Sequence, residues 1–315
     1  MLEINIVHVN NNYDNVLNMG HIPKYPEFKL VDKSDKPVFQ TYTMGFASYS
    51  DFNLLSLLSW NTSKTSAYSI LNNNLVIKLK DYLGDNFIYS VLGNSHIQET
   101  LTTLLRDFNM LSMVPEVVIK NVTDNSFFSC EEDRDNFDYI MKCEKIGELN
   151  GSEYKHLRHD INHFNSLYGA ALVKSINLDD SVVLSKINRL DTKWYTNKKY
   201  EADKINEQEQ VFSNFLNNCR YFDMLNLGFF LGDELIGYIL SEKFSENEVI
   251  SHFGCSDSDY AYCDYALKYY VARKLYELGF LYQNQEQDAG LPGLRTAKMF
   301  YNPEFFLKKY KITLK

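Results

Sequence analysis

The feature that most limits the fold of this chain is a set of three apolar, strand-like runs separated by short turns. The runs cover residues 224–231, 235–244 and 249–253. The turns between them are Gly232-Asp233-Glu234 and Ser245-Glu246-Asn247, and connections of three residues join adjacent antiparallel strands. The sequence therefore predicts an antiparallel meander, around which the other elements of this half must pack.

Helical patterns lie on both sides of the meander. Asn150 and Glu153 form a helix-start signature, and apolar residues then recur at steps of three and four up to residue 168. The other elements expected here are helices that include 211–219 and 264–278, a strand at 280–284, a short helix opened by Pro292 and a strand at 305–314. This order of helices and strands is that of an acyltransferase fold of the GNAT type.

The first half repeats this order in a degenerate form, which we interpret as a weak internal repeat. Its expected elements are a helix at 54–60, a hairpin at 68–79 that turns at Asn72-Asn73-Asn74, a strand at 87–92, a helix that starts at Ser95 with Gln98 as capping partner, and a strand at 114–122. The predicted fold class is α/β (α+β): two tandem GNAT-like folds with largely antiparallel mixed sheets flanked by helices. Residues 1–145 would form a degenerate N-terminal domain, and residues 146–315 a C-terminal domain with the candidate site.

Composition excludes several classes of protein. Of the 315 residues, 45% are hydrophobic and 23% are charged, which is typical of a globular chain. The net charge of −9 excludes a strongly basic nucleic-acid coat. The five cysteines form no C-x-x-C pair, so neither a disulfide framework nor a zinc ribbon is expected. Because the sequence has no run of ~18 apolar residues and no signal peptide, it predicts a cytoplasmic protein without a transmembrane segment.

Two histidines on the predicted helix at 150–168 have a spacing that suits a metal ion. His159 and His163 are four residues apart, on the polar face opposite Leu157 and Ile161. No third ligand of suitable spacing follows them, and a solvated helix face is the favoured explanation. We therefore expect both side chains to be exposed and expect no metal site.

Two stretches carry a resemblance to a known family. Residues 149–164 read LNGSEYKHLRHDINHF, and residues 286–303 follow the pattern E-Q-D-x-G-x-x-G-L-R-x-A-K-x-x-Y-x-P. Together they resemble the C-terminal domain of bacterial phosphatidylglycerol lysyltransferases and its soluble, uncharacterised relatives. The resemblance implies two tandem GNAT-like folds and a transferase that uses aminoacyl-tRNA as one donor. The membrane-spanning part of the lysyltransferases is not in this sequence.

The candidate site residues lie in the second stretch and next to it. Glu286 and Asp288 follow the end of a predicted strand, where carboxylates can hold a substrate ammonium or take a proton from it. Arg295 and Lys298 are one turn apart on the next helix, and an arginine fork can grip a carboxylate or a phosphate. With Asn284, these two cations make up the predicted substrate-binding group. The alternative is a salt-bridge knot that pins the loop.

Tyr301 completes the predicted catalytic set together with the two carboxylates. In GNAT folds a tyrosine near this place can act as general acid toward the leaving group; the alternative is a tyrosine that packs on Pro303. We expect the four charged candidates to converge on one pocket, at the mouth between the strands at 249–253 and 280–284.

The segment 254–264 bears on the donor. In typical GNAT enzymes a glycine-rich turn here offers backbone N–H groups to the pyrophosphate of coenzyme A. This chain has a single glycine, Gly254, beside Asp257, Asp259 and Asp264, and carboxylates repel a pyrophosphate. The ordinary mode of coenzyme A binding is therefore not favoured, and the acidic net charge does not favour tRNA either.

Two functions stay open from the sequence. The first is an acyl- or aminoacyl-transferase that moves an acyl group from an activated ester or thioester donor to an amine or hydroxyl acceptor. Acyl-coenzyme A and aminoacyl-tRNA are its candidate donors, and a small molecule or a lipid headgroup is its candidate acceptor; no tightly bound cofactor is expected. The second is a non-catalytic ligand- or partner-binding module on a duplicated GNAT scaffold.

Overall fold

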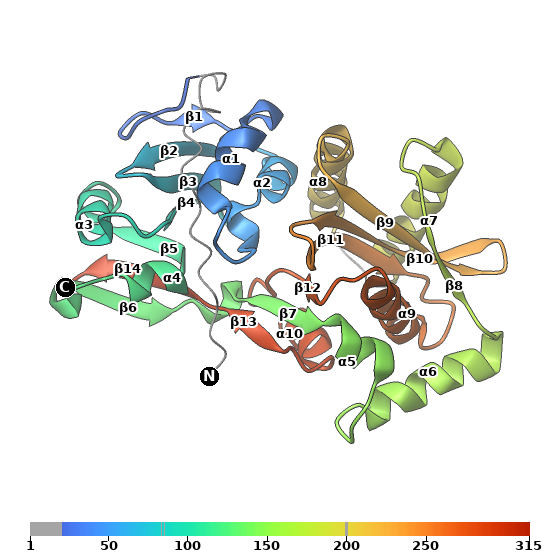
Figure 1. The fold of residues 1–315 in the computed structure, drawn as a ribbon. Coiled ribbons are helices and arrows are strands. Elements are labelled where there is room, and N and C mark those ends of the chain that lie inside the picture. The colour runs from blue at the N-terminus through green and yellow to red at the C-terminus, as the bar shows by residue number, and fades with distance from the viewer. Residues whose placement is uncertain (1–20, 83, 85, 199–200) are drawn as a thin grey trace.

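The computed structural model describes residues 21–82, 84, 86–198 and 201–315. Within these residues the strands form three sheets, of four, seven and three strands. Most neighbouring strands are antiparallel, and helices lie along the sheets (Figure 1). The predicted fold class, largely antiparallel mixed sheets flanked by helices, is confirmed.

The seven-stranded sheet contains the meander and has the order β13-β7-β12-β11-β10-β9-β8. Its strands, in chain order, are β7 (Asp138–Lys142), β8 (Leu172–Ser175), β9 (Met224–Leu231), β10 (Glu234–Lys243), β11 (Glu248–Ser256), β12 (Tyr282–Asn284) and β13 (Phe305–Leu307). Strands β9, β10 and β11 are successive antiparallel neighbours, so the predicted meander is confirmed. Strands β11 and β12 are parallel, with Ile250 opposite Asn284, so the residues that follow β12 run beside the second half of β11.

Six helices pack around this sheet. They are α5 (Cys143–Glu148), α6 (Lys155–Tyr168), α7 (Ser181–Lys198), α8 (Ala202–Cys219), α9 (Cys263–Glu277) and α10 (Pro292–Met299). Helix α6 buries Leu157, Ile161 and Phe164 as predicted, and His159 and His163 are exposed. The expected start at Asn150 is wrong, because the turn at 150–153 precedes the helix and Tyr154 is its N-cap.

The four-stranded sheet belongs to the first half and has the order β1-β2-β3-β4. Its strands are β1 (Lys29–Leu30), β2 (Ala67–Leu71), β3 (Asn74–Lys80) and β4 (Phe87–Leu92), and its neighbouring helices are α1 (Lys36–Thr43), α2 (Leu54–Trp60) and α3 (Ile97–Phe108). The hairpin of β2 and β3 turns at Asn72 and Asn73, which both have positive φ. The predicted hairpin, strand and two helices of this region are therefore present.

Two local predictions in the first half are wrong. The run at 114–122 is not a strand: β5 (Met110–Pro115) ends at its proline, and α4 (Glu116–Lys120) follows. Proline favours the first turn of a helix and cannot donate to a strand ladder, so the chain changes conformation there. Ser95 is not a helix cap either, because its N–H bonds to the Asn74 side chain and His96 is the N-cap residue of α3.

The expected final strand at 305–314 is two strands in different sheets. β13 pairs with β7, whereas β14 (Lys309–Leu314) lies between β5 and β6 (Phe128–Glu132) in the three-stranded sheet. The fully buried Lys309 explains the crossing, since it pairs with Asp51 of the first half and with Asp138 at 2.9 Å. The division at 145/146 stays a prediction, although strand pairing crosses it at both β7 and β14.

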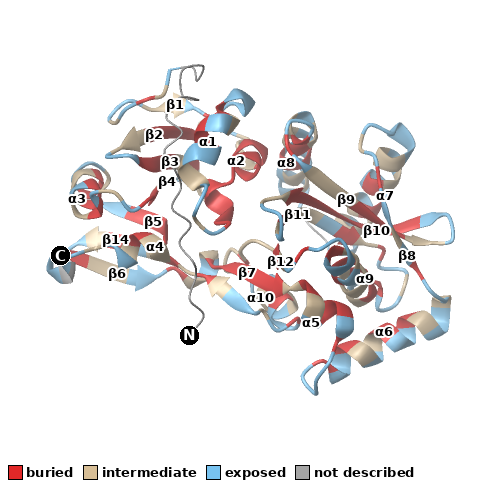
Figure 2. Ribbon diagram, in the orientation of Figure 1, coloured by how far each residue is buried: buried red, intermediate tan, exposed pale blue. Residues whose placement is uncertain are grey.

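The buried residues follow the central strands and the helix faces turned toward them (Figure 2). Leu75 and Ile77 of β3 are fully buried, as are Ile236 and Leu240 of β10. One apolar cluster continues from the first half into the second, and it includes both Tyr68 and Tyr238. The two halves therefore share packed core, and polar contacts between them lie in a desolvated environment. Short 3₁₀ turns complete the fold at Lys33–Asp35, Ser50–Phe52, Asn125–Phe127 and Arg134–Asn136.

Candidate functional site

A short segment of the first half, residues 48–56, makes several polar contacts with the second half. Asn53 caps helix α2, since its Oδ1 accepts a hydrogen bond from the Ser56 N–H at 2.8 Å. Its Nδ2 donates to Glu242 Oε2 at 2.8 Å, and the Ser56 hydroxyl donates to Glu286 Oε1 at 2.9 Å. The same residues that start α2 therefore orient two glutamates of the other half.

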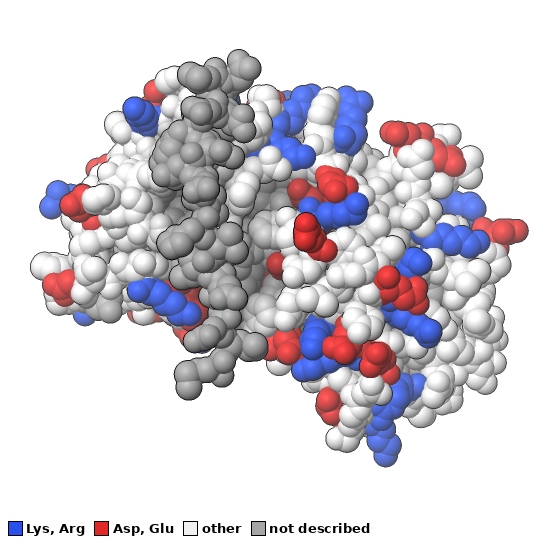
Figure 3. Space-filling view, viewed as in Figure 1, with Lys and Arg blue, Asp and Glu red and all other residues white. Residues whose placement is uncertain are grey.

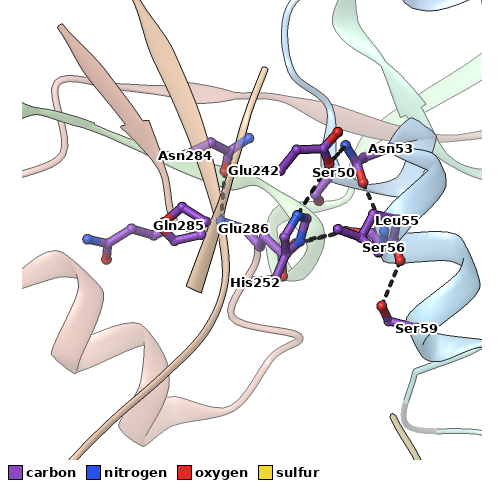
Figure 4. A network of polar contacts seen from close by, with 12 residues as sticks. Ser50, Asn53, Leu55, Ser56, Ser59, Glu242, His252, Asn284, Gln285 and Glu286 are labelled. Atoms are coloured by element: carbon purple, nitrogen blue, oxygen red, sulfur yellow. Dashed lines mark hydrogen bonds and ion pairs between the residues drawn. The ribbon is translucent and has the colours of Figure 1, made fainter. Parts of the chain in front are cut away.

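Glu242 and Glu286 enclose a buried histidine, His252 (Figure 4). His252 Nδ1 lies 3.0 Å from Glu286 Oε1, and its Nε2 lies 3.5 Å from Glu242 Oε2. Glu242 comes from β10 and His252 from β11, whereas Glu286 follows β12. Because β11 and β12 are parallel with Ile250 opposite Asn284, two further residues along both strands bring Glu286 beside His252.

The two carboxylates keep His252 protonated at neutral pH. Burial alone would lower the pKa of His252, but its interactions with Glu242 and Glu286 outweigh burial and raise the pKa to about 9. The imidazole side chain is only 3% exposed, so solvent screens these interactions little. Two carboxylates and one imidazolium leave this cluster, which we call the Glu–His–Glu cluster, with one net negative charge.

The Glu–His–Glu cluster reaches a cavity of about 480 Å³ through Glu242. Asn53 and Glu242 line this cavity beside aromatic residues of both halves, among them Phe39 and Phe222. Asn53 and His252 both approach Glu242 Oε2, and no residue in the described part of the chain donates a hydrogen bond to Oε1. The arrangement therefore offers a fixed carboxylate with one free oxygen at the wall of an amphipathic cavity.

Asp288 and Arg295, by contrast, close on each other. Arg295 Nε and Nη2 each donate to a different oxygen of Asp288 at 2.9 Å, and Tyr139 and the Gly290 N–H donate to the same carboxylate at 2.5 and 2.8 Å. Burial would raise the pKa of Asp288, but these hydrogen bonds outweigh it and lower the pKa. Arg295 also pairs with Asp135. This is the knot that the sequence left open as the alternative.

Lys298 and Asn284 hold the backbone of the loop that carries Glu286. Lys298 Nζ donates to the carbonyl oxygens of Gln285, Glu286 and Gln287 at 2.6, 3.2 and 2.6 Å. Burial lowers the pKa of Lys298 to about 8. Asn284 Oδ1 accepts from the Glu286 N–H at 2.7 Å, and Glu286 has a positive φ of 56°. Glu286 is thus fixed in a conformation that L-residues rarely adopt.

Tyr301 lies apart from these groups. It is fully buried among Tyr139, Leu157 and Ala272, and its hydroxyl donates to Asp264 at 3.3 Å. Burial, aided by Asp264, raises the pKa of Tyr301 well above 10. This environment is that of a packed tyrosine.

The expected convergence of the four charged candidates on one pocket is wrong. Glu286 faces His252, Asp288 and Arg295 face each other, and Lys298 faces backbone carbonyls. None of the four lines the 480 Å³ cavity. The two carboxylates have different partners, since Glu286 contacts His252 of β11 whereas Asp288 is held by Arg295 of α10.

Sequence reasoning missed Glu242 and Asn53 and assigned no role to His252. A charged residue inside a strongly apolar strand was the available signal for Glu242, because buried polar residues are the informative exceptions in a core. No group of three or more potential metal ligands occurs among the described residues. A search of that same part of the chain found no helix with the length and apolar character needed to cross a membrane.

The family model described as phosphatidylglycerol lysyltransferase, C-terminal, matches residues 46–313. A conserved protein of unknown function from Bacteroides thetaiotaomicron has a similar structure, with a TM-score of 0.75 and 21% identity over 91% of this chain and 99% of that chain. L-PGS from Bacillus licheniformis has a TM-score of 0.59 and 14% identity, over 93% of this chain and 94% of that chain. FemX has a TM-score of 0.54 and 10% identity, over 90% of this chain and 96% of that chain. No curated protein sequence matches the chain. These identities establish likeness of fold alone.

Proposed function

Because the chain belongs to the family of phosphatidylglycerol lysyltransferase C-terminal domains, we propose that it is a transferase that moves an acyl or aminoacyl group from an activated ester or thioester to an amine or hydroxyl. One observation carries this proposal: Glu242 lines a 480 Å³ cavity, His252 and Asn53 approach its Oε2, and no described residue donates to its Oε1. A carboxylate in that position suits a base that acts on a bound nucleophile.

The proposed reaction needs little beyond positioning and one proton acceptor. The acceptor's nitrogen or oxygen attacks the carbonyl carbon of the donor, and its proton passes to Glu242 Oε1. A new C–N or C–O bond forms, and the bond from the carbonyl carbon to the donor's oxygen or sulfur breaks. The electron pair leaves with that oxygen or sulfur, which takes the proton back from Glu242. His252, whose Nε2 lies 3.5 Å from Glu242 Oε2, helps to orient the carboxylate.

In this proposal, most of the site residues predicted from the sequence support Glu242 indirectly. Glu286 holds His252, and Asn284 and Lys298 fix the backbone that carries Glu286. Asp288 and Arg295 secure the rest of the loop. Tyr301 has no part in the proposed chemistry, because its side chain is buried in the core and its hydroxyl donates to Asp264 rather than into the cavity.

Of the two candidate donors, the proposal favours aminoacyl-tRNA. The turn that binds pyrophosphate in ordinary GNAT enzymes contains Asp257 and Asp259, which share Lys193 here. The cation nearest that turn is therefore already neutralised, which leaves coenzyme A little to bind. A cytoplasmic location is part of this proposal, as is a small-molecule or lipid-headgroup acceptor.

The test is a transfer assay with radiolabelled acetyl-coenzyme A and lysyl-tRNA as donors and with glycerol phosphate and lipid vesicles as acceptors. We expect transfer by the native chain and a loss of 10²–10⁴-fold in Glu242→Gln, the usual contribution of a general base. Glu234→Gln is the matched control, since Glu234 is half-exposed on the same strand and pairs with Arg189. Full activity in Glu242→Gln would refute the assigned role.

The closed pair of Asp288 and Arg295 favours a second candidate function, a non-catalytic binding module on the same scaffold. In that case the 480 Å³ cavity binds its ligand without turnover. Ligand binding with no transfer from either donor, in the assay above, is the result that this alternative predicts.

A further inference from the structure

A second cavity, of about 460 Å³, lies over the four-stranded sheet of the first half. Four of its lining residues form one row across the sheet, in which each is paired with the next: Leu30 of β1, Ala67 of β2, Lys78 of β3 and Tyr89 of β4. Residues directly opposite each other on neighbouring strands have their side chains on the same face. No residue that lines this cavity also lines the 480 Å³ cavity at Glu242, so the two spaces are separate.

The row is open because helix α3 covers only the neighbouring part of this sheet face. Val76 and Val91 are the next pair on the same face of β3 and β4, and both are fully buried in one apolar cluster with Leu101 of α3. Helix α3 ends at Phe108, whose ring stacks on Tyr89 with centroids 3.7 Å apart and an interplanar angle of 7°. The sheet face beyond this stack is therefore left as the cavity.

Aromatic rings form the wall at this end of the cavity. Phe28 meets Tyr89 edge-to-face with centroids 6.1 Å apart, and Tyr25 meets Phe108 in the same way at 6.2 Å. Tyr25 and Phe28 also contact each other, with centroids 6.0 Å apart. Because the four rings hold one another in place, they offer a rigid apolar surface on which the ring of a ligand can pack.

Lys78 and Asp107 are the charged residues that line the cavity, and neither forms an ion pair with another described residue. Lys78 Nζ lies over the Phe87 ring, 4.1 Å from its centroid. The Tyr25 hydroxyl donates to one carboxylate oxygen of Asp107, and no described residue donates to the other. In the view of Figure 3, by contrast, many Lys and Arg side chains of the second half, on the right, lie beside Asp or Glu. The cavity therefore holds one positive and one negative group that have no partner of opposite charge in the described part of the chain.

The position of Asp107 is unfavourable for the helix that carries it. Asp107 lies in the last turn of α3, where the unpaired carbonyl groups already make the helix end negative, so a carboxylate there costs stability. Residues that break a local rule in this way are expected at functional sites. A ligand ammonium at this place gains from both the carboxylate and the helix end.

We propose that this cavity binds a free α-amino acid with an aromatic side chain. The carboxylate of the ligand pairs with Lys78, and its ammonium pairs with the free oxygen of Asp107. The contacts from Lys78 to Asp107 run through the stacked rings of Tyr89 and Phe108, so a ligand held at both charges places its own ring against the aromatic wall. The cavity volume lies in the usual range of small-molecule sites, about 300–1,000 Å³. Binding here does not depend on the reaction proposed at Glu242.

The first test compares ligands on the native full chain by calorimetric titration. L-Phenylalanine should bind saturably. Phenethylamine lacks the carboxylate, N-acetyl-L-phenylalanine lacks the ammonium and L-alanine lacks the ring. Each of these three should bind about tenfold more weakly, or worse, because each loses one of the three contacts. The absence of L-phenylalanine binding would overturn the proposal, as would an equal affinity for any of the three analogues.

Two variants assign the contacts to residues. Lys78→Gln should weaken L-phenylalanine binding about tenfold and leave phenethylamine binding unchanged, whereas Asp107→Asn should weaken L-phenylalanine binding equally and leave N-acetyl-L-phenylalanine binding unchanged. Lys120→Gln is the control, since it removes the same charge from an exposed pair with Glu116. Native affinity for L-phenylalanine in both variants would refute the proposal. If either variant fails to fold, the comparison of ligands on the native chain still decides.

Discussion

Two ionic clusters flank the loop between β12 and α10, and they differ in how completely their charges are satisfied. At Asp288, both carboxylate oxygens accept hydrogen bonds from Arg295, and Tyr139 and a backbone N–H add to them. At Glu242, Asn53 and His252 both approach Oε2, no described residue donates a hydrogen bond to Oε1, and the residue lines a cavity. The first cluster is closed by its own residues, whereas the second leaves a carboxylate oxygen for a ligand.

The comparison shows that charge density alone does not identify a reactive site. The long motif at 286–303 mainly makes the loop after β12 rigid. Lys298 donates hydrogen bonds to backbone carbonyls of this loop, and Arg295 donates to its Asp288. The groups that face open space come from β10 and α2, outside that motif. The closed cluster of Asp288 and Arg295 therefore stabilises the fold, whereas the open Glu–His–Glu cluster has the group suited to chemistry.

The largest expected effect is on the closed cluster. Asp288→Ala should lower the free energy of unfolding by about 3 kcal/mol, because Asp288 is fully buried and its loss leaves the donors of Tyr139, Gly290 and Arg295 without their acceptor. Urea denaturation measures this. Asp135→Ala, which removes the exposed partner of the same Arg295, should change the free energy by less than about 0.5 kcal/mol. Similar small losses in both variants would contradict the comparison.

The Glu–His–Glu cluster should make the free energy of unfolding depend on pH. The folded pKa of His252, about 9, lies above its ordinary value of 6.5. Its contribution is therefore complete below pH 6.5 and is lost as pH rises through 9. At about 1.4 kcal/mol per pH unit, the loss is roughly 3–4 kcal/mol.

Comparison with His252→Gln at each pH isolates this contribution from other titrating groups. Lys298 gives stability a pH dependence of the opposite sign. Burial lowers its pKa to about 8, so the free-energy cost of burying its positive charge decreases as pH rises above 8. The native chain should lose its advantage over the variant between pH 6.5 and 9. An advantage that is constant over this range would show that His252 is not held as an imidazolium.

Asn53→Asp separates the two roles of that residue. An aspartate keeps the helix cap, because a carboxylate accepts the Ser56 N–H, but it loses the donor that faces Glu242. We expect a loss of ~1 kcal/mol in unfolding free energy and about a tenfold lower transfer rate. A rate equal to that of the native chain would remove Asn53 from the account of Glu242.

Tyr301→Phe should have the smallest effect. It removes one hydroxyl whose hydrogen bond to Asp264 is 3.3 Å long, so the unfolding free energy should change by less than about 1 kcal/mol. The transfer rate should stay within about twofold of the native rate. A loss of two orders of magnitude would restore the tyrosine as a general acid.

Much of the fold could be predicted because local patterns specify it. The short turns of the β9–β11 meander and the apolar spacing of α6 depend only on neighbouring residues. The final strand could not be divided correctly, since its change of sheet depends on burying Lys309 against Asp51 and Asp138, far away in sequence.

The candidate site was predicted in part for the same reason. Glu286 and Lys298 stand in a motif that can be read directly. The contact between Glu286 and His252 follows from the register of the parallel strands β11 and β12, which no local pattern encodes. Asn53 reaches Glu242 from the other half of the chain.

The most direct test of the central claim is an NMR titration of His252 in the native chain and in Glu242→Gln and Glu286→Gln. The account predicts a pKa near 9 in the native chain and a clear fall toward 6.5 in each variant, because each loses one of the two carboxylates that hold the imidazolium. A native pKa at or below 6.5, unchanged in both variants, would contradict the claim that an ionised Glu–His–Glu cluster presents its charge to the cavity.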